Sequence, residues 1–195
     1  MPFMGRTKAF NETEILEKAV SLFWKQGYLA TSPDEIVNDL GISRSSMYNT
    51  FGDKRKLFIK SLKRYIDTKT KKMIANLDAS DNARECLTAV FNSMIDCNGD
   101  NNQYGCFVIN TTVELSDADA EIRDILDRNH RKILQALGGL IERSRQNETL
   151  SSLVNSKKLA QFIYNSIIGI RVNVRAKTSK TELKNIAEMT LSVLT

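Results

Sequence analysis

The chain has 195 residues, of which 42% are hydrophobic and 26% charged, and its nine Gly and two Pro exclude the compositions of disordered and fibrous proteins. This length allows one or two compact domains with a substantial core. The formal charge of +5 is uneven, because the first 72 residues hold 14 Lys and Arg against 8 Asp and Glu, an excess typical of a polyanion-binding module but also of a solvated basic face.

The first predicted helix covers residues 12–26. Asn11 supplies an N-cap, and acidic residues follow it in the first turn. Apolar side chains then recur at the period of an amphipathic helix. Gly27 is expected to end this helix as a left-handed C-cap.

Two shorter helices are predicted next. Ser32, a proline and Glu35 form a helix-start signature, in which a hydroxyl caps the first turn and a carboxylate lies at its third position. This helix ends after about two turns at Gly41, and Ser43 offers an N-cap for the next helix, to about residue 50. Two short helices joined by Leu-Gly-Ile-Ser predict a helix-turn-helix.

A long helix with one apolar face is predicted after Asp53, and turn-forming residues at 78–82 then mark a domain boundary. The fold class is therefore all-α, with about nine helices. The expected parts are a helix-turn-helix domain over 1–52, a connector helix over 53–77 and a second domain over 78–195. The helices expected in the second domain lie near 82–97, 104–114, 118–147, 156–176 and 181–194, with a loop at 98–102.

The helices predicted at 156–176 and 181–194 carry unusually wide apolar arcs. Two explanations stay open. The pair packs within the core of one subunit, or two copies of the pair form a symmetric four-helix dimer interface. A homodimer through these two helices is the functional expectation.

The third helix has the chemistry of a helix that reads the major groove of DNA. Such a helix needs short or planar polar side chains that reach base edges: Arg pairs with guanine, Asn pairs with adenine, and Ser adapts to either. A capped surface helix is the alternative, and capping explains Ser43 without explaining the donors that follow it. The predicted base-reading residues are Arg44, Ser45, Ser46 and Asn49.

Phosphate groups beside that groove require donors at fixed places. The second and fourth helices begin with such donors, and the backbone N–H groups of helix starts add to them. These contacts position a protein on DNA without reading sequence. The predicted phosphate contacts are Thr31, Ser32, Tyr48, Thr50 and Lys54.

The stretch ILEKAVSLFWKQGYLATSPDEIVNDLGISRSSMYNTFGDKRKL, from Ile15 to Leu57, resembles the DNA-binding domain of the TetR family of transcriptional regulators. The remaining two thirds resemble the family only in helical layout and length. The positions that carry the resemblance are Leu22-Phe23, Gly27-Tyr28, Thr31-Ser32, Ile36, Gly41-Ile42-Ser43, Tyr48, Phe51, Lys54 and Leu57.

The resemblance implies an all-helical homodimer that binds a palindromic double-stranded DNA operator. It implies a repressor that a small molecule, bound in the second domain, releases from DNA. Carried over by position, it supports the base-reading and phosphate assignments above. Ser45 and Thr50 differ from residue types common in the family, so the operator sequence does not follow. The basic residues Arg6-Thr7-Lys8 are expected to add a minor-groove or phosphate contact.

Cys106 is a candidate sensor of electrophiles or oxidants. It follows Gly105 at the start of a predicted helix, and some branches of the family have a similar Gly-Cys pair. A helix N-terminus favours the thiolate, which is the reactive form of cysteine. The alternative is that Cys106 packs as a small hydrophobic residue.

A ligand cavity is expected in the second domain, where polar groups inside an apolar cavity orient a ligand. Asn129 and His130 interrupt the apolar stripe of the helix at 118–147 and are candidates on that ground. For each candidate, a purely structural role is the alternative. The predicted lining is Phe91, Ile95, Cys106, Phe107, Asn110, His130, Tyr164 and Arg171.

Cysteine and histidine usage argues against other kinds of site. Cys86, Cys97 and Cys106 are an odd number without CxxC spacing, which disfavours a disulfide framework and favours a reducing compartment. His130 is the single histidine, so we expect no metal and no cofactor. No segment approaches about 20 apolar residues, and the start lacks a secretory apolar core. A cytoplasmic protein with no membrane partner is expected.

Three other functions compete with that of a repressor. An enzyme that uses Cys106 or a serine with His130 as base lacks a nucleophile elbow and a Gly-rich phosphate loop. A non-specific architectural DNA binder would show strong salt dependence and little sequence preference. An activator would use the same DNA-binding helices, so sequence does not separate it from a repressor.

Overall fold

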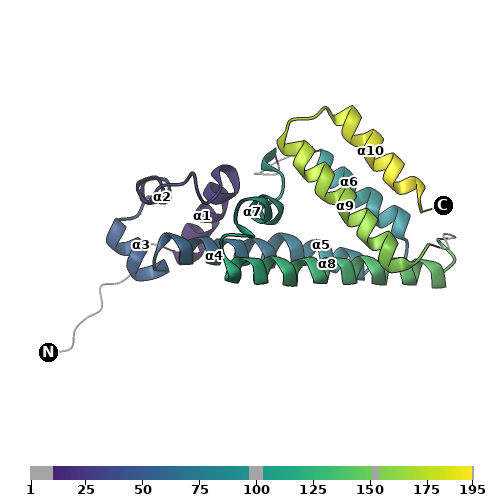
Figure 1. The fold of residues 1–195 in the computed structure, drawn as a ribbon, viewed down its shortest axis with the longest axis horizontal. Coiled ribbons are helices and arrows are strands. Elements are labelled where there is room, and N and C mark those ends of the chain that lie inside the picture. The colour runs from purple at the N-terminus through teal and green to yellow at the C-terminus, as the bar shows by residue number, and fades with distance from the viewer. Residues whose placement is uncertain (1–10, 97–102, 151–153, 195) are drawn as a thin grey trace. The chain divides into compact units, whose positions relative to one another are not determined.

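The computed structural model describes residues 11–96, 103–150 and 154–194, and within these ranges it contains helices and no strands. The all-α prediction is confirmed. Counting the uninterrupted run from α4 to α5 as one helix, the described residues form nine helices (Figure 1). The elements are α1 Glu12–Gln26, α2 Pro33–Leu40, α3 Arg44–Phe51, α4 Lys54–Tyr65, η1 Ile66–Thr70, α5 Lys71–Asp78, α6 Ala83–Ile95, α7 Phe107–Leu115, α8 Ala120–Gln146, α9 Ser156–Arg175 and α10 Lys180–Ser192.

Internal contacts divide the chain into two compact units, residues 1–64 and 65–195. This division falls inside the predicted connector, so the connector contributes residues to both units. The functional limits 1–52, 53–77 and 78–195 stay a prediction.

The first unit is a helix-turn-helix stabilised by side-chain caps and an aromatic cluster. The Asn11 side chain caps α1, and the Ser32 side chain caps α2. Gly41 ends α2 at φ 67°, a left-handed conformation that strains any residue with a Cβ. Phe58 of α4 lies edge-on to Phe23 of α1, with ring centroids 5.0 Å apart, and both rings are buried. The sequence signals for these helix ends are therefore confirmed.

The run from α4 to α5 contains a π-helical segment, η1. Asp53 Oδ1 accepts a hydrogen bond from Lys56 N at 2.7 Å and so caps the start of α4, as predicted. The N–H of Lys71 bonds to the carbonyl of Ile66, five residues earlier, which is the π-helical pattern. One extra residue per turn rotates the following side chains relative to an α-helix. The amphipathic period of the sequence did not predict this insertion.

The second unit packs α8 against α9 and α5, and packs α10 against α6 and α9. Figure 1 shows α6, α9 and α10 side by side, with α5 running beside α8. Its core is a single cluster of buried aliphatic and aromatic side chains from α5, α6, α8, α9 and α10, with Leu137, Leu140 and Ile163 fully buried. The apolar stripe predicted along α8 is the face that contributes to this core.

The start of α7 differs from the prediction. The helix expected at 104–114 begins at Phe107, because residues 103 and 104 form a 3₁₀ turn and Gly105 takes a φ of 77°. The expected loop at 98–102, Cys97 and the basic residues 6–8 lie outside the described residues. No helix among the described residues is both long enough and apolar enough to cross a membrane.

Candidate DNA-binding surface and ligand cavity

Helix α3 buries one side and presents the other to solvent. Met47 and Phe51 are buried against the first unit's core. Arg44, Ser45 and Asn49 are exposed. Because three of the four predicted base-reading side chains are exposed on one short helix, the surface has the composition that major-groove recognition requires.

The start of α3 is closed by a small network of hydroxyl groups. Ser43 Oγ accepts a hydrogen bond from Ser46 N at 3.1 Å and lies 2.9 Å from Ser46 Oγ and 3.0 Å from Ser45 Oγ. Ser46 is half-buried, in contrast to the exposed Ser45. The network fixes the first turn of α3 and holds both hydroxyl groups close to the helix start.

Arg44 already has a partner within the first unit. Its guanidinium donates to the Asp34 carboxylate of α2, and the two side chains are 55% and 78% exposed. An ion pair this exposed contributes about 0–1 kcal/mol, so it does not hold Arg44 away from a stronger acceptor. The pair links the two helices of the helix-turn-helix while leaving Arg44 available to DNA.

The predicted phosphate contacts fall into two groups. Tyr48 is 48% exposed, Ser32 is exposed, and Thr50 and Lys54 are half-buried. Lys54 Nζ lies 4.3 Å from the centroid of the Tyr28 ring, a cation–π contact that supports the ammonium group near the start of α4. These four side chains reach the surface of the first unit.

Thr31 differs from the other four, because its side chain is buried at 1% exposure. Its hydroxyl donates a 2.6 Å hydrogen bond to the carbonyl of Gly27, at the end of α1. The hydroxyl therefore closes the α1–α2 turn in place of the phosphate contact expected from the sequence. The local sequence is the same whether such a hydroxyl is buried and bonded or exposed. Only the fold distinguishes the two cases.

Ser32 and Glu35 form a capping box at the start of α2. Glu35 N donates to Ser32 Oγ at 3.2 Å, and Ser32 N donates to Glu35 Oε2 at 2.7 Å. The hydrogen bonds from the Ser32 backbone and side chain lower the pKa of the Glu35 carboxyl. The box fixes the helix start while Ser32 stays exposed.

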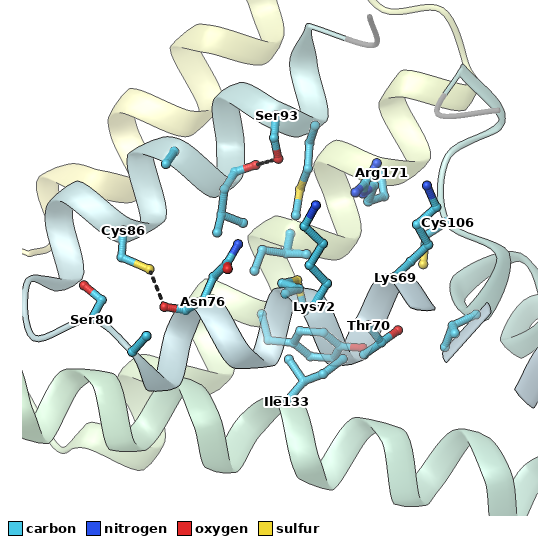
Figure 2. A pocket seen from close by; sticks show the side chains of 18 of the residues that line it. Lys69, Thr70, Lys72, Asn76, Ser80, Cys86, Ser93, Cys106, Ile133 and Arg171 are labelled. Atoms are coloured by element: carbon cyan, nitrogen blue, oxygen red, sulfur yellow. Dashed lines mark hydrogen bonds between the residues drawn. The ribbon is translucent and has the colours of Figure 1, made fainter. Parts of the chain in front are cut away.

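A cavity of about 790 Å³ lies within the second unit, a volume within the usual range for small-molecule sites. Its lining comes from the run of η1 and α5 and from α6, α7, α8 and α9. Figure 2 shows these side chains converging from the surrounding helices. The polar and charged groups among them include Tyr65, Lys69, Thr70, Lys72, Asn76, Asp81, Glu85, Cys86, Cys106, Asn129, Tyr164 and Arg171.

Three of the eight predicted cavity residues line this cavity: Cys106, Tyr164 and Arg171. Asn129, which interrupts the apolar stripe of α8, lines it as well. The structure therefore places these residues at one cavity, and their role as ligand contacts stays a prediction.

The other five predicted cavity residues lie elsewhere. Phe91, Ile95 and Phe107 are buried packing groups and do not line the cavity. Asn110 donates to the carbonyl of Tyr104 at 3.0 Å, which ties α7 to the turn before it. His130 is exposed, and its ring lies edge-on to Tyr164 with centroids 5.0 Å apart.

The sequence analysis missed the contribution of α5 and η1 to the cavity. Tyr65, Lys69 and Thr70 line it, and they belong to the π-helical segment or precede it directly. An uninterrupted α-helix would point the side chains after the π-helical turn in a different direction. A prediction from the α-helical period therefore did not place them at the cavity. Lys72 follows in α5 and completes this wall.

Cys106 lies at the N-cap position of α7 and is half-buried. Tyr65 Oη donates to Cys106 Sγ at 3.6 Å, and Tyr65 is buried. Burial, followed by the neighbouring Cys106, raises the pKa of Tyr65 well above its usual value. Cys106 therefore lines the cavity, and its hydrogen-bond partner is a neutral hydroxyl group. This contact gives no indication that the thiol is reactive.

Family models match both parts of the chain. The model described as bacterial regulatory proteins, tetR family, matches residues 15–60, and the model described as tetracyclin repressor-like, C-terminal domain, matches residues 83–190. The second match alone covers more than half of the chain.

Similar proteins span the whole length of the chain. The HTH-type transcriptional repressor ComR of Escherichia coli (strain K12) is 30% identical over 96% of this chain and 90% of its own. The uncharacterised HTH-type transcriptional regulator YezE of Bacillus subtilis (strain 168) is 27% identical over 98% of this chain and 100% of its own. Among solved structures, a cysteine variant of the TetR family regulator CifR complexed with 26-bp operator DNA has a TM-score of 0.83 at 21% identity, covering 98% of this chain and 100% of its own.

Proposed function

Because this chain belongs to the TetR family of bacterial regulatory proteins, we propose that it is a dimeric repressor that a small molecule releases from a palindromic operator. The observation that carries the proposal is α3, which buries Met47 and Phe51 and exposes Arg44, Ser45 and Asn49. We assign base reading to Arg44, Ser45, Ser46 and Asn49. We assign phosphate contacts to Ser32, Tyr48, Thr50 and Lys54.

Dimerisation is assigned to α9 and α10. Phe162 and Val172 of α9 are 47% and 49% exposed, and Ile186 and Met189 of α10 are 39% and 72% exposed. The opposite faces of both helices are buried in the core of the second unit, so core packing accounts for one face only. A Cβ added at Gly169, between the two exposed residues of α9, meets no atom within 4 Å. This exposed apolar face suits a second copy of the pair.

Ligand response is assigned to the helical run from α4 to α5. Its first part carries Lys54 at the DNA-binding surface, and its last part carries Lys72 at the cavity. A ligand weakens DNA binding only if it prefers a conformation in which the two recognition helices of the dimer no longer match half-sites about 34–36 Å apart. Because the helical run is continuous, a change of conformation at the cavity is expected to reach the DNA-binding helices through it.

Operator binding tests the function. Genomic fragments selected by the purified protein are expected to share a palindrome next to a small set of genes, and the protein is expected to prefer it by about 10³-fold or more over random DNA. A reporter under that operator separates repression from activation by the direction in which expression changes when the regulator gene is deleted. Binding that stays equal across all sequences would contradict the proposal and indicate an architectural protein.

Two variants separate base reading from phosphate contact. Asn49→Ala is expected to weaken operator binding about tenfold or more and to leave binding to random DNA unchanged. Lys54→Ala is expected to weaken binding to both DNAs equally and to reduce the salt dependence by about one counterion. Lys132→Ala, an exposed lysine of α8, is the control for charge.

The cysteine-sensor alternative is not specifically favoured by the relatives or by the geometry of Cys106. Cys106→Ser is therefore expected to leave operator binding and ligand release unchanged. The proposed place of action is the cytoplasm, where the operator is, and the proposed role is regulation instead of catalysis.

A further inference from the structure

The cavity contains a buried amide without a partner. Asn129 of α8 is 3% exposed, and neither its Nδ2 nor its Oδ1 has a hydrogen-bond partner in the described part of the chain. Buried polar side chains in folded proteins are nearly always bonded, because an unbonded one loses its hydration without replacement. Asn129 also lines the cavity, so a bound ligand is a candidate partner for this amide.

A cationic group with a buried, unbonded nitrogen lines the same cavity. Arg171 lies on α9 seven residues after Tyr164 and four after Ile167, which places all three on one helix face, and all three line the cavity. Its Nη1 is buried and has no acceptor among the described residues. The carbonyl of Arg171 would lie 2.7 Å from a Cβ at position 105, so the backbone of this turn is fixed against Gly105.

The charges of the cavity are divided between two ends. Figure 2 shows Lys69 and Arg171 at the end where Cys106 lies, Lys72 between the two ends, and Ser80 and Cys86 at the other end. The two acidic lining residues, Asp81 and Glu85, are sequence neighbours of Ser80 and Cys86. Arg171 and Lys69 at one end favour a negatively charged group there.

The remaining walls are apolar. They come from α5, α6, α7, α8 and α9, and they suit a hydrophobic body several carbon atoms in extent. The apolar residues that line the cavity are Met73, Ala79, Ala89, Val90, Met94, Val108, Ile109, Ile133 and Ile167.

We propose that the effector of this regulator is an organic carboxylate, whose acidic group binds Arg171 and the amide of Asn129 and whose apolar body lies against the aliphatic walls. A carboxylate has two oxygens, so it can accept from both donor types that these residues supply, the guanidinium of Arg171 and Nδ2 of Asn129. Lys69, an exposed lysine at the same end, adds positive charge there. The inference rests on the proposed function, because it names the class of molecule that the regulator senses.

Calorimetry with the full-length protein and matched probes tests the ligand class. Octanoate and 2-naphthoate are to be compared with octanamide and 2-naphthamide, which have the same bodies without the charge. At least one carboxylate is expected to bind about tenfold or more tightly than its amide, because only the carboxylate pairs with Arg171. Equal or tighter binding of both amides, or no binding of either acid up to millimolar concentration, would overturn the carboxylate assignment.

Variants locate the acidic group. Arg171→Gln is expected to weaken the carboxylate about tenfold and to leave the amide within about threefold, while Arg131→Gln, an exposed arginine of α8 outside the cavity, changes neither. Asn129→Leu removes the unbonded amide, so it is expected to keep or raise the melting temperature while weakening the carboxylate. An Arg171→Gln protein that folds and keeps the full preference for the carboxylate would also overturn the assignment.

Operator binding, measured on the same ligand-free preparations, separates this inference from the proposed function. If the protein binds its operator but shows no preference for the carboxylate, the carboxylate assignment is wrong and the repressor function stands. If the protein binds the carboxylate but no operator, the repressor function is wrong and the carboxylate site stands.

Discussion

The base-reading role proposed for Arg44 requires this residue to exchange one partner for another. In the structure its guanidinium is paired with Asp34, an exposed carboxylate on the neighbouring helix α2. The pair costs little to break, and the carboxylate also repels any phosphate that comes near. We therefore expect Asp34 to lower the affinity for DNA and to hold Arg44 in place before binding.

Asp34→Asn is expected to tighten operator binding about threefold at low salt, because it removes a repulsive charge and releases Arg44. Fluorescence anisotropy at two salt concentrations measures the change, and the gain is expected to shrink at high salt. Asp39→Asn, which removes another exposed carboxylate of α2, is the control. An equal gain in both variants would assign the effect to net charge instead of Arg44.

Tyr164 links the cavity to the stability of the second unit at alkaline pH. Burial, followed by Cys106, raises its pKa to about 12, compared with 10 for an unperturbed tyrosine. A raised pKa in the folded state gives stability that is complete below pH 10 and that falls as the pH rises toward 12.

Tyr164→Phe removes this ionisation. Between pH 9.5 and 11.5 the variant is expected to lose about 2 kcal/mol less unfolding free energy than the natural chain, as measured by urea denaturation. Tyr48→Phe, at an exposed position in α3, is the control. Identical alkaline losses in the natural chain and in Tyr164→Phe would show that Tyr164 ionises without unfolding.

Most individual helices were predictable from caps, and the cavity was predictable only in part. Asn11, Ser32 and Ser43 each combine a capping side chain with an apolar run, and each helix begins where that signal lies. The π-helical segment has no such signal, because its side chains keep a plausible α-helical pattern. The residues that it turns into the cavity, including Thr70, were therefore absent from the prediction.

At the scale of elements, the capping box of α2 makes the helix-turn-helix sensitive to one hydroxyl. Ser32→Ala is expected to lower the unfolding free energy by about 1 kcal/mol, since Glu35 N loses its acceptor. Ser179→Ala removes the equivalent box of α10 and is expected to cost a similar amount. Urea denaturation compares the two, and a Ser32→Ala protein of unchanged stability would contradict the structural role of the box.

At the scale of the whole molecule, regulation depends on joining two copies of the chain. Each copy exposes Phe162, Val172 and Met189 on its last two helices, and a palindrome requires two copies of α3. Whether the two chains pair in this way is not encoded in any short motif. The wide apolar arcs predicted that these two helices carry an apolar surface. Only the fold shows which part of each arc is buried in the core and which part is exposed.

Val172→Glu is expected to convert the dimer to a monomer, because it places a charge within the apolar face of α9. Sedimentation measures the mass, and operator affinity is expected to fall about 100-fold or more as one half-site is lost. Val113→Glu, at an exposed apolar position of α7, is the control. A Val172→Glu chain that stays dimeric would move the interface to another face.

The contact between Gly105 and the carbonyl of Arg171 limits how this protein can be converted into a biosensor for other compounds. A methyl group at position 105 would lie 2.7 Å from that oxygen and would displace the backbone that carries the arginine. Randomised libraries that spare positions 105 and 171 can still vary Met73, Val90 and Met94 on the aliphatic side. Such libraries are expected to change the size of the recognised body while keeping the preference for acids, so a reporter strain built this way would distinguish acids by their carbon skeletons.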